Sequence, residues 1–243
     1  MNFYLIVPVA IDRPEFQDEC PYLLAETKTG KIPVLEGIQG LDLELFSAIY
    51  LVLLKKHDEL YGISEKLNRH IATLPYGNKF HSVFLEHSTL SETESVYETI
   101  KKEKISGSLL VKDADNFFIC DCIQGNGVAI YPLDALTRVN PQHKSYVTLD
   151  DFFNITNIIE KKIIGRHFCT GGYFFETASD FLYYFEKLQK YHPFYMSFLI
   201  FAMLLDGVTF RPVFVEEYQD WGTREDWQYA VREATIPTAA GLL

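Results

Sequence analysis

The sequence predicts an α/β fold of three layers, in which a mixed, mostly parallel β-sheet is covered by helices on both faces. Continuous apolar runs such as residues 48–54 (AIYLVLL) predict strands that are buried on both sides, as in parallel sheets. Segments with helical spacing alternate with these runs, as in folds built from β-α units. Hydrophobic residues make up 48% of the chain and charged residues 23%, which is enough apolar material for a large core.

The expected strands are short apolar runs bounded by polar or turn-forming residues. They cover residues 3–9, 48–54, 79–85, 108–111, 128–131, 145–149 and 209–215. Apolar and polar residues also alternate over 157–162, before a loop that leads to Phe168. The polar, proline-containing stretch 11–33 predicts a long loop after the first strand. In open α/β sheets such a loop lies at the carboxyl edge of the sheet, where ligands bind.

Helices are expected where apolar residues recur at helical spacing. They cover residues 57–70, 94–104, 177–190, 193–205 and 225–232. Thr177 is a predicted N-cap, and Gly207 a predicted residue just beyond a helix end. The length favours one domain over residues 1–243, and the small, apolar tail 235–243 is expected to lack a fixed structure.

The net charge of −11 at pH 7 argues against DNA, RNA and anionic lipid as general partners. A nucleotide remains compatible with this charge, because a metal ion can neutralise phosphates locally. The start of the chain lacks the features of a signal peptide, and the longest apolar run, 194–205, is too short for a membrane span. Four cysteines without a C-x-x-C pair indicate reduced thiols and a cytoplasmic location.

Two carboxylates, Asp113 and Asp115, directly follow the predicted strand 108–111. At that position they would point into the ligand crevice of an α/β sheet, and Mg²⁺ prefers one or two protein carboxylates. A turn with two solvated acids is the alternative for this D-x-D element. Asp220 follows the last predicted strand, and could share a cation with Asp115; alternatively it caps a turn beside Trp221 in the core.

Other candidate sites are weaker. The seven histidines show no metal-ligand spacing, and Cys120 and Cys122 are expected in the core rather than as ligands. The chain contains no G-x-S-x-G element.

Several motifs occur in the order found in one enzyme family. They are residues 91–95 (SETES), 108–118 (SLLVKDADNFF), 144–147 (KSYV), 158–162 (IIEKK), 170–175 (TGGYFF) and 218–223 (YQDWGT). On these segments the chain resembles the bacterial sugar-phosphate nucleotidyltransferases of the glycosyltransferase-A-like, Rossmann-like fold. These enzymes join a nucleoside triphosphate to a sugar 1-phosphate or a similar phosphorylated substrate and release pyrophosphate.

The resemblance implies roles for individual residues and a Mg²⁺ cofactor. Asp115 and Asp220 would hold the metal, with Asp115 also taking part in catalysis. Ala10, Glu92, Thr93 and Asp113 would contact the nucleotide. Glu160, Lys161, Gly172 and Tyr173 would contact the sugar and its phosphate. The resemblance further implies nucleoside triphosphate and sugar phosphate (or sugar nucleotide) as partners, a part in surface-polysaccharide precursor synthesis, and assembly into homo-oligomers as an open expectation.

The front loop departs from the family, which carries a glycine-rich A-G-x-G-[ST]-R-F loop followed by P-K-P-L. Here residues 10–16 are AIDRPEF and residues 21–24 are PYLL. Both glycines are absent, Glu15 replaces the arginine, and Tyr22 replaces the lysine. A carboxylate beside a triphosphate opposes binding. Arg13 and Lys28 are therefore the candidate replacements as catalytic cations.

Three functions remain open at this point. The chain is an active nucleotidyltransferase, a catalytically impaired relative that binds sugar phosphate or sugar nucleotide, or a glycosyltransferase of the same fold that uses the D-x-D metal site. Dependence of turnover on Arg13 or Lys28 would separate the first from the second. Transfer from, or hydrolysis of, a sugar nucleotide would favour the third.

Overall fold

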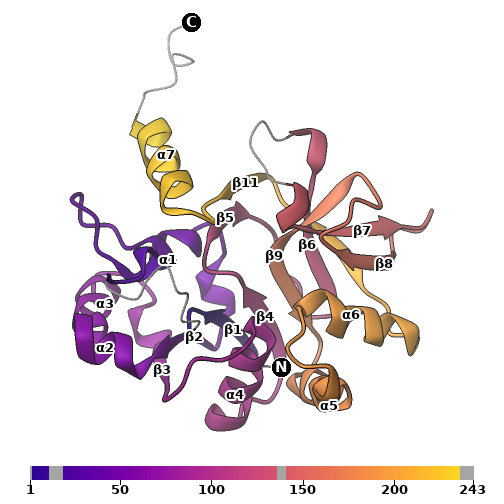
Figure 1. Ribbon diagram of the computed structural model, residues 1–243, viewed down its shortest axis with the longest axis horizontal. Helices are drawn as coiled ribbons and strands as arrows, with labels where there is room; N and C mark the ends of the chain where they lie inside the picture. Colours follow the sequence, from indigo (N-terminus) through magenta and orange to yellow (C-terminus); the bar gives the residue numbers. More distant parts are fainter. Residues whose placement is uncertain (1, 11–18, 136–140, 236–243) are drawn as a thin grey trace, which may run out of the picture.

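A computed structural model describes residues 2–10, 19–135 and 141–235 of the chain. Its centre is a large sheet whose main path runs β10-β6-β9-β4-β1-β2-β3, with β7 and β8 attached beside β9 (Figure 1). The strands of this sheet are β1 (Phe3–Pro8), β2 (Ala48–Leu54), β3 (Phe80–Leu85), β4 (Ser108–Lys112), β6 (Gly127–Pro132), β7 (Ser145–Leu149), β8 (Ile155–Glu160), β9 (His167–Phe175) and β10 (Arg211–Phe214). A separate two-stranded sheet pairs β5 (Asn116–Ile119) with β11 (Glu217–Asp220).

Strand directions confirm the predicted mixed, mostly parallel sheet. β1 is parallel to both β2 and β4, β2 is parallel to β3, and β6 is parallel to β10. β9 is antiparallel to both of its neighbours on the path, β4 and β6. The other six strands of the main path therefore all point the same way, and their carboxyl ends meet along one edge.

Helices cover both faces of the sheet, which gives the three predicted layers. They are α1 (Pro33–Gly37), α2 (Lys55–Tyr61), α3 (Ile63–Ile71), α4 (Glu92–Glu103), α5 (Ala178–Leu188), α6 (Met196–Leu205) and α7 (Arg224–Thr235). Side chains alternate along β1, so that Ile6 packs in one core with α4, α5 and α6. Leu5 packs in the opposite core with α1 and α3.

The structure corrects several of the expected elements. The single helix predicted over 57–70 is wrong: Gly62 adopts φ of +61° and separates α2 from α3, because a residue without Cβ reaches the left-handed region without strain. The stretch 11–33 is expected as a loop; its described part holds a short 3₁₀ turn at Tyr22–Leu24 and ends where α1 begins. β5, β9 and β11 have no counterpart among the predicted strands.

Two predicted helix ends are confirmed. The Thr177 side chain accepts a hydrogen bond from the Asp180 N–H at the start of α5, and Gly207 has φ of +84° just beyond α6. Of the tail 235–243, only Thr235 lies within the described residues. No helix in the described ranges is both long and apolar enough to cross a membrane.

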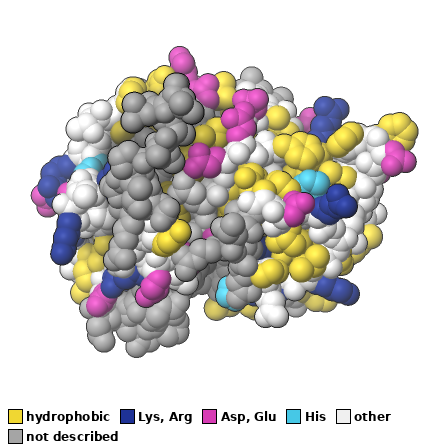
Figure 2. Space-filling model, turned by 90° about the horizontal axis from the view of Figure 1, so that it is seen from above, with side chains coloured by type: hydrophobic (Ala, Val, Ile, Leu, Met, Phe, Trp, Pro, Cys, Tyr) yellow, Lys and Arg dark blue, Asp and Glu magenta, His cyan; other side chains and the backbone are white. Residues whose placement is uncertain are grey.

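Apolar side chains reach the surface at the end of the molecule that carries β7, β8 and β10. Phe152 and Phe153 in the β7–β8 turn are 86% and 63% exposed, and Phe214 of β10 is 49% exposed. The rings of Phe153 and Phe214 lie 6.4 Å apart. Figure 2 shows hydrophobic side chains gathered on this side of the molecule, at the right of the view.

Candidate functional site

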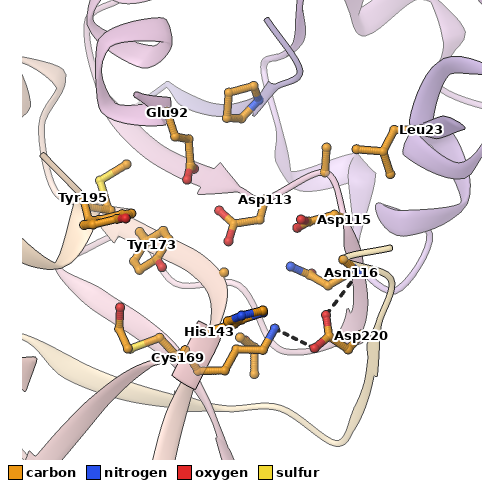
Figure 3. Close-up of a pocket in the computed structure, with 18 of the residues that line it drawn as sticks. Leu23, Glu92, Asp113, Asp115, Asn116, His143, Cys169, Tyr173, Tyr195 and Asp220 are labelled. Atoms are coloured by element: carbon orange, nitrogen blue, oxygen red, sulfur yellow. Dashed lines mark hydrogen bonds and ion pairs between the residues drawn. The ribbon is translucent and has the colours of Figure 1, made fainter. Parts of the chain in front are cut away.

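A cavity of about 970 Å³ lies at the carboxyl ends of β1 and β4. Its walls come from segments far apart in the sequence: the end of β1, the Tyr22–Leu24 turn, the start of α4, the β4–β5 turn, β9, and the ends of β8 and β11. Most of its labelled side chains are polar and converge on one space (Figure 3). This is the position at which open α/β sheets bind ligands.

A buried lysine stabilises the β4–β5 turn by hydrogen bonds. Lys112, the last residue of β4, is fully buried, and its Nζ donates to the Asn116 Oδ1 at 2.6 Å and to the backbone oxygens of Asp113 and Asn116 at 2.9 Å each. Its ammonium also lies 4.5 Å from the centre of the Phe118 ring. Burial lowers the pKa of Lys112 to about 8. These bonds fix the turn that carries Asp113 and Asp115.

Gly171 of β9 lets the Asp113 carboxylate occupy the cavity wall. The Asp113 N–H donates to the Gly171 carbonyl at 2.7 Å, and Gly171 has φ of +84°. A Cβ at Gly171 would lie 2.3 Å from Asp113 Oδ2. Only glycine therefore fits at this position without displacing the acid.

Glu92 reaches the same space from the first turn of α4. Ser91 caps that helix by accepting from the Glu94 N–H at 3.3 Å, and Glu94 Oε2 accepts from the Leu90 N–H at 2.6 Å. Burial, the charge of Asp113 and a hydrogen bond to it raise the pKa of Glu92 well above its usual value. Burial likewise raises the pKa of Asp113 to about 6. The pair of carboxyl groups therefore keeps a proton at a higher pH than isolated acids would.

Asp115 and Asp220 are brought to the same wall by the small sheet. β11 pairs with β5 so that Asp220 stands opposite Asn116, and the Trp221 N–H donates to the Asp115 carbonyl at 2.9 Å. Two carboxylates on adjacent elements are a donor set of the kind that Mg²⁺ takes. Asp220 Oδ2 also lies 2.9 Å from Lys144 Nζ (Figure 3).

Glu160 and Lys161 line the cavity from the end of β8. Glu160 Oε2 accepts hydrogen bonds from Ser145 and, at 2.8 Å, from Ser197, which hold its carboxylate in place. Lys161 Nζ donates to the Tyr195 hydroxyl at 2.6 Å. Tyr173 is buried in the cavity wall, and burial together with the charge of Asp113 raises its pKa.

The remaining predicted site residues lie elsewhere. Ala10 and Thr93 are fully buried outside the cavity lining, and the Thr93 hydroxyl donates to the Phe194 carbonyl at 2.9 Å. A Cβ at Gly172 would meet Phe118 and Ala129, so this residue faces the core, and Gly171 faces the cavity in its place. Lys28 is exposed in a separate pocket beside α7. Arg13 lies outside the described residues.

Sequence reasoning gave no role to three residues of the site: Lys112, Lys144 and Gly171. The sequence offers a signal for the first, a lysine that ends an apolar strand directly before D-x-D. Lys144 opens the 144–147 motif, but that motif does not reveal its contact with Asp220, 76 positions away.

The described lining of the cavity holds more acidic than basic side chains. Among the described residues, six acidic side chains line the cavity (Glu92, Asp113, Asp115, Glu160, Asp220 and Asp226) against two ammonium groups, those of Lys144 and Lys161. An anionic ligand would therefore need an accompanying cation. Within the described part of the chain, no three His, Cys, Asp or Glu side chains form a metal cluster, but Mg²⁺ needs only one or two carboxylates alongside phosphate and water.

The architecture is that of solved sugar nucleotidyltransferases, although no family model and no curated protein matches the chain. The nucleoside-diphosphate-sugar pyrophosphorylase from Vibrio cholerae superposes with a TM-score of 0.75 at 15% identity, covering 94% of this chain and 99% of that one. The inositol-1-phosphate CTP transferase from T. maritima gives 0.70 at 13% identity, covering 96% and 94%. A UDP-glucose pyrophosphorylase complexed with UDP-glucose gives 0.68 at 12% identity, covering 96% and 98%.

Proposed function

We propose that this protein, built on the fold of the sugar nucleotidyltransferases, transfers a nucleotide from a nucleoside triphosphate to a sugar 1-phosphate or a similar phosphorylated substrate. The observation that carries the proposal is the presence of Asp115 and Asp220 in the same cavity as Glu160 and Lys161. One set suits a metal-bound triphosphate and the other a phosphorylated sugar. The structural neighbours named for nucleotide sugars and for inositol 1-phosphate favour the same substrate class.

The charge of the cavity supports a requirement for Mg²⁺. Asp115 and Asp220 would hold the ion, which would neutralise the phosphates and the charge that develops on them. A triphosphate alone would be repelled by the ionised acids among the described cavity residues.

The chain's own residues would then bind and orient the reactants. The Glu160 carboxylate, fixed by Ser145 and Ser197, would accept hydrogen bonds from sugar hydroxyls. Lys161 would reach the substrate phosphate. An oxygen of that phosphate attacks the α-phosphorus in line, the bond to the β-phosphate breaks, and pyrophosphate leaves with the electron pair. Positioning and charge neutralisation supply most of the acceleration in such phosphoryl transfers.

The front loop favours a second candidate, a relative that binds sugar nucleotide without turnover. Residues 10–16 lack both glycines of the family's phosphate loop and carry Glu15. Lys28, one of the two candidate replacements, faces a pocket distinct from the main cavity. The free thiols of the four cysteines are consistent with a cytoplasmic location for either candidate.

Pyrophosphate release tests the proposal. The wild-type protein is incubated with Mg²⁺ and a panel of nucleoside triphosphates and sugar 1-phosphates, and a coupled assay follows pyrophosphate. We expect turnover with at least one pair, and a loss of roughly 100-fold or more in Asp115→Asn, the usual effect of removing a group that stabilises transition-state charge. Asp121→Asn, the same change at an exposed aspartate outside the cavity, should stay within about twofold of wild type.

Calorimetry on the same proteins distinguishes the other functions. Binding of a sugar nucleotide with no pyrophosphate release from any pair would establish the impaired relative. Hydrolysis of a sugar nucleotide, or its transfer to an acceptor, would identify a glycosyltransferase. Equal turnover in wild type and Asp115→Asn would refute the metal assignment, and no binding of any ligand in the panel would refute the proposal.

A further inference from the structure

Lys144 forms an ion pair with Asp220, one of the two carboxylates that would bind the metal. Lys144 Nζ lies 2.9 Å from Asp220 Oδ2, and it donates a hydrogen bond to the Tyr218 hydroxyl at 2.7 Å. The side chains of Lys144 and Asp220 are only 15% and 20% exposed. This pair is therefore fixed in the cavity wall and is not a mobile surface ion pair.

The other oxygen of Asp220 is also engaged. Asp220 Oδ1 accepts from the Gly222 N–H at 3.3 Å. Glu92 Oε1 and Asp113 Oδ1 differ, because both are buried in the same cavity region without a hydrogen-bond partner among the described residues. Both oxygens of Asp220 are therefore engaged, whereas Glu92 and Asp113 each keep one buried oxygen without a partner in the described part of the chain.

The reason for such an arrangement is electrostatic. A half-buried carboxylate without a counter-charge is costly, so the Lys144 ammonium stabilises Asp220 when no metal is present. A divalent cation bound to Asp220 at normal Mg²⁺–oxygen distances of about 2.0–2.1 Å would lie very close to that ammonium. The metal ion and the Lys144 ammonium would repel each other strongly in this partly buried site, so they cannot both stay bound to Asp220.

We propose that Lys144 competes with a divalent cation for Asp220, so that the empty cavity binds metal weakly and takes it up together with phosphate. The ammonium has three N–H groups and two partners among the described residues, Asp220 and Tyr218. A phosphate group offers it replacement acceptors when the metal takes Asp220. The proposal rests on the proposed function for the identity of the phosphate ligand, but its test uses metal alone.

The test is the affinity of the intact, nucleotide-free protein for Mn²⁺, followed by electron paramagnetic resonance. We expect Lys144→Met to bind Mn²⁺ at least tenfold more tightly than wild type. Adding Asp220→Asn to Lys144→Met should return the affinity to the wild-type value, because the gain depends on that carboxylate. Lys161→Met is the matched control: it removes the other lysine that lines the cavity, which bonds to Tyr195, and should change the affinity less than twofold.

Two results would overturn the proposal: equal Mn²⁺ affinity in wild type and Lys144→Met, or a gain that persists without Asp220. Circular dichroism checks that each variant is folded, and Lys144→Gln, which keeps a hydrogen-bond donor without the charge, replaces Lys144→Met if that variant is not. A gain in Mn²⁺ affinity in a protein that never releases pyrophosphate would support this inference while the proposed function fails.

Discussion

Individual residues in this cavity are held in charge states that their surroundings impose. Asp113 and Glu92 face each other across the cavity wall with raised pKa values, whereas Lys112 behind them has a lowered one. Burial is the first cause in all three cases, and it always disfavours the charged form. Ionisation of the two acids therefore destabilises the folded protein unless a bound cation compensates, whereas the charge of Lys112 is compensated by its hydrogen bonds and by the nearby acids.

Asp113 makes this effect measurable. An aspartate in an unfolded chain has a pKa of about 3.9, and the folded value is about 6. Between these values the native state binds more protons than the unfolded state, so the contribution of Asp113 to stability falls as the pH rises through that window. Asp113→Asn should therefore raise the free energy of unfolding at pH 7.5 by roughly 1–3 kcal/mol, and the gain should vanish near pH 4.

Urea denaturation at the two pH values measures this difference. Asp121→Asn, at an exposed position, is the control and should show little change at either pH. A gain for Asp113→Asn that is the same at pH 4 and pH 7.5 would contradict a raised pKa at this residue.

At the scale of residues, the location of a side chain could be predicted from sequence where the order of strands alone determines it. Asp115 and Asp113 follow a short strand with an apolar centre, residues 109–111, so their position at the carboxyl edge could be inferred. Lys144 could not be found this way, since a single cation leaves no periodic pattern and its partner Asp220 is distant in sequence.

At the scale of elements, continuous apolar strands were the most predictable part of the chain. The bounds of β2 and β7 agree with the sequence prediction. For β2 the reason is that a strand buried along its whole length carries an unbroken apolar signal. β9 was missed as a strand because Thr170, Gly171 and Gly172 interrupt its apolar residues. Those same small residues are what allow β9 to pass close to the β4–β5 turn.

Gly171 and Gly207 allow two reasons for a glycine to be compared: a positive φ, and a lack of space for a Cβ atom. Both have φ of +84°, but a Cβ at Gly207 would meet nothing within 4 Å, whereas at Gly171 it would collide with Asp113. Gly207→Ala should therefore cost about 1–2 kcal/mol from backbone strain alone. Gly171→Ala should cost about 2 kcal/mol more, and chemical denaturation of the two variants measures the difference. Equal losses would mean that Asp113 moves aside freely.

At the scale of the whole molecule, α7 closes the cavity region through a small aromatic cluster. The rings of Trp221 and Trp227 lie 4.6 Å apart, and the Tyr22 hydroxyl donates to the Trp221 carbonyl at 2.5 Å. This cluster joins the early 3₁₀ turn to the last helix and stands apart from the two main cores. The layered sheet was predicted from the alternation of elements, but this long-range closure was not, because it depends on contacts between the two ends of the chain.

Trp227→Ala should loosen α7 without unfolding the sheet. The loss of a large buried ring costs about 3–5 kcal/mol, and here it acts on one small cluster. We expect faster tryptic cleavage at the exposed Arg224, with an unchanged far-ultraviolet spectrum apart from α7. Tyr229→Ala removes an aromatic ring that is 46% exposed on the same helix, and serves as the control. Equal cleavage rates in both variants would show that the cluster does not anchor α7.

The pairing of β5 with β11 has a consequence for the order in which the protein is made. β5 leaves the ribosome roughly 100 residues before its partner, which is about 5–20 s at common elongation rates. During that delay β1 to β4 can already pair, while the wall that carries Asp220 does not yet exist. A nascent or prematurely terminated chain without β11 could therefore form most of the main sheet but not the complete binding site. The cavity is completed only when synthesis is nearly finished.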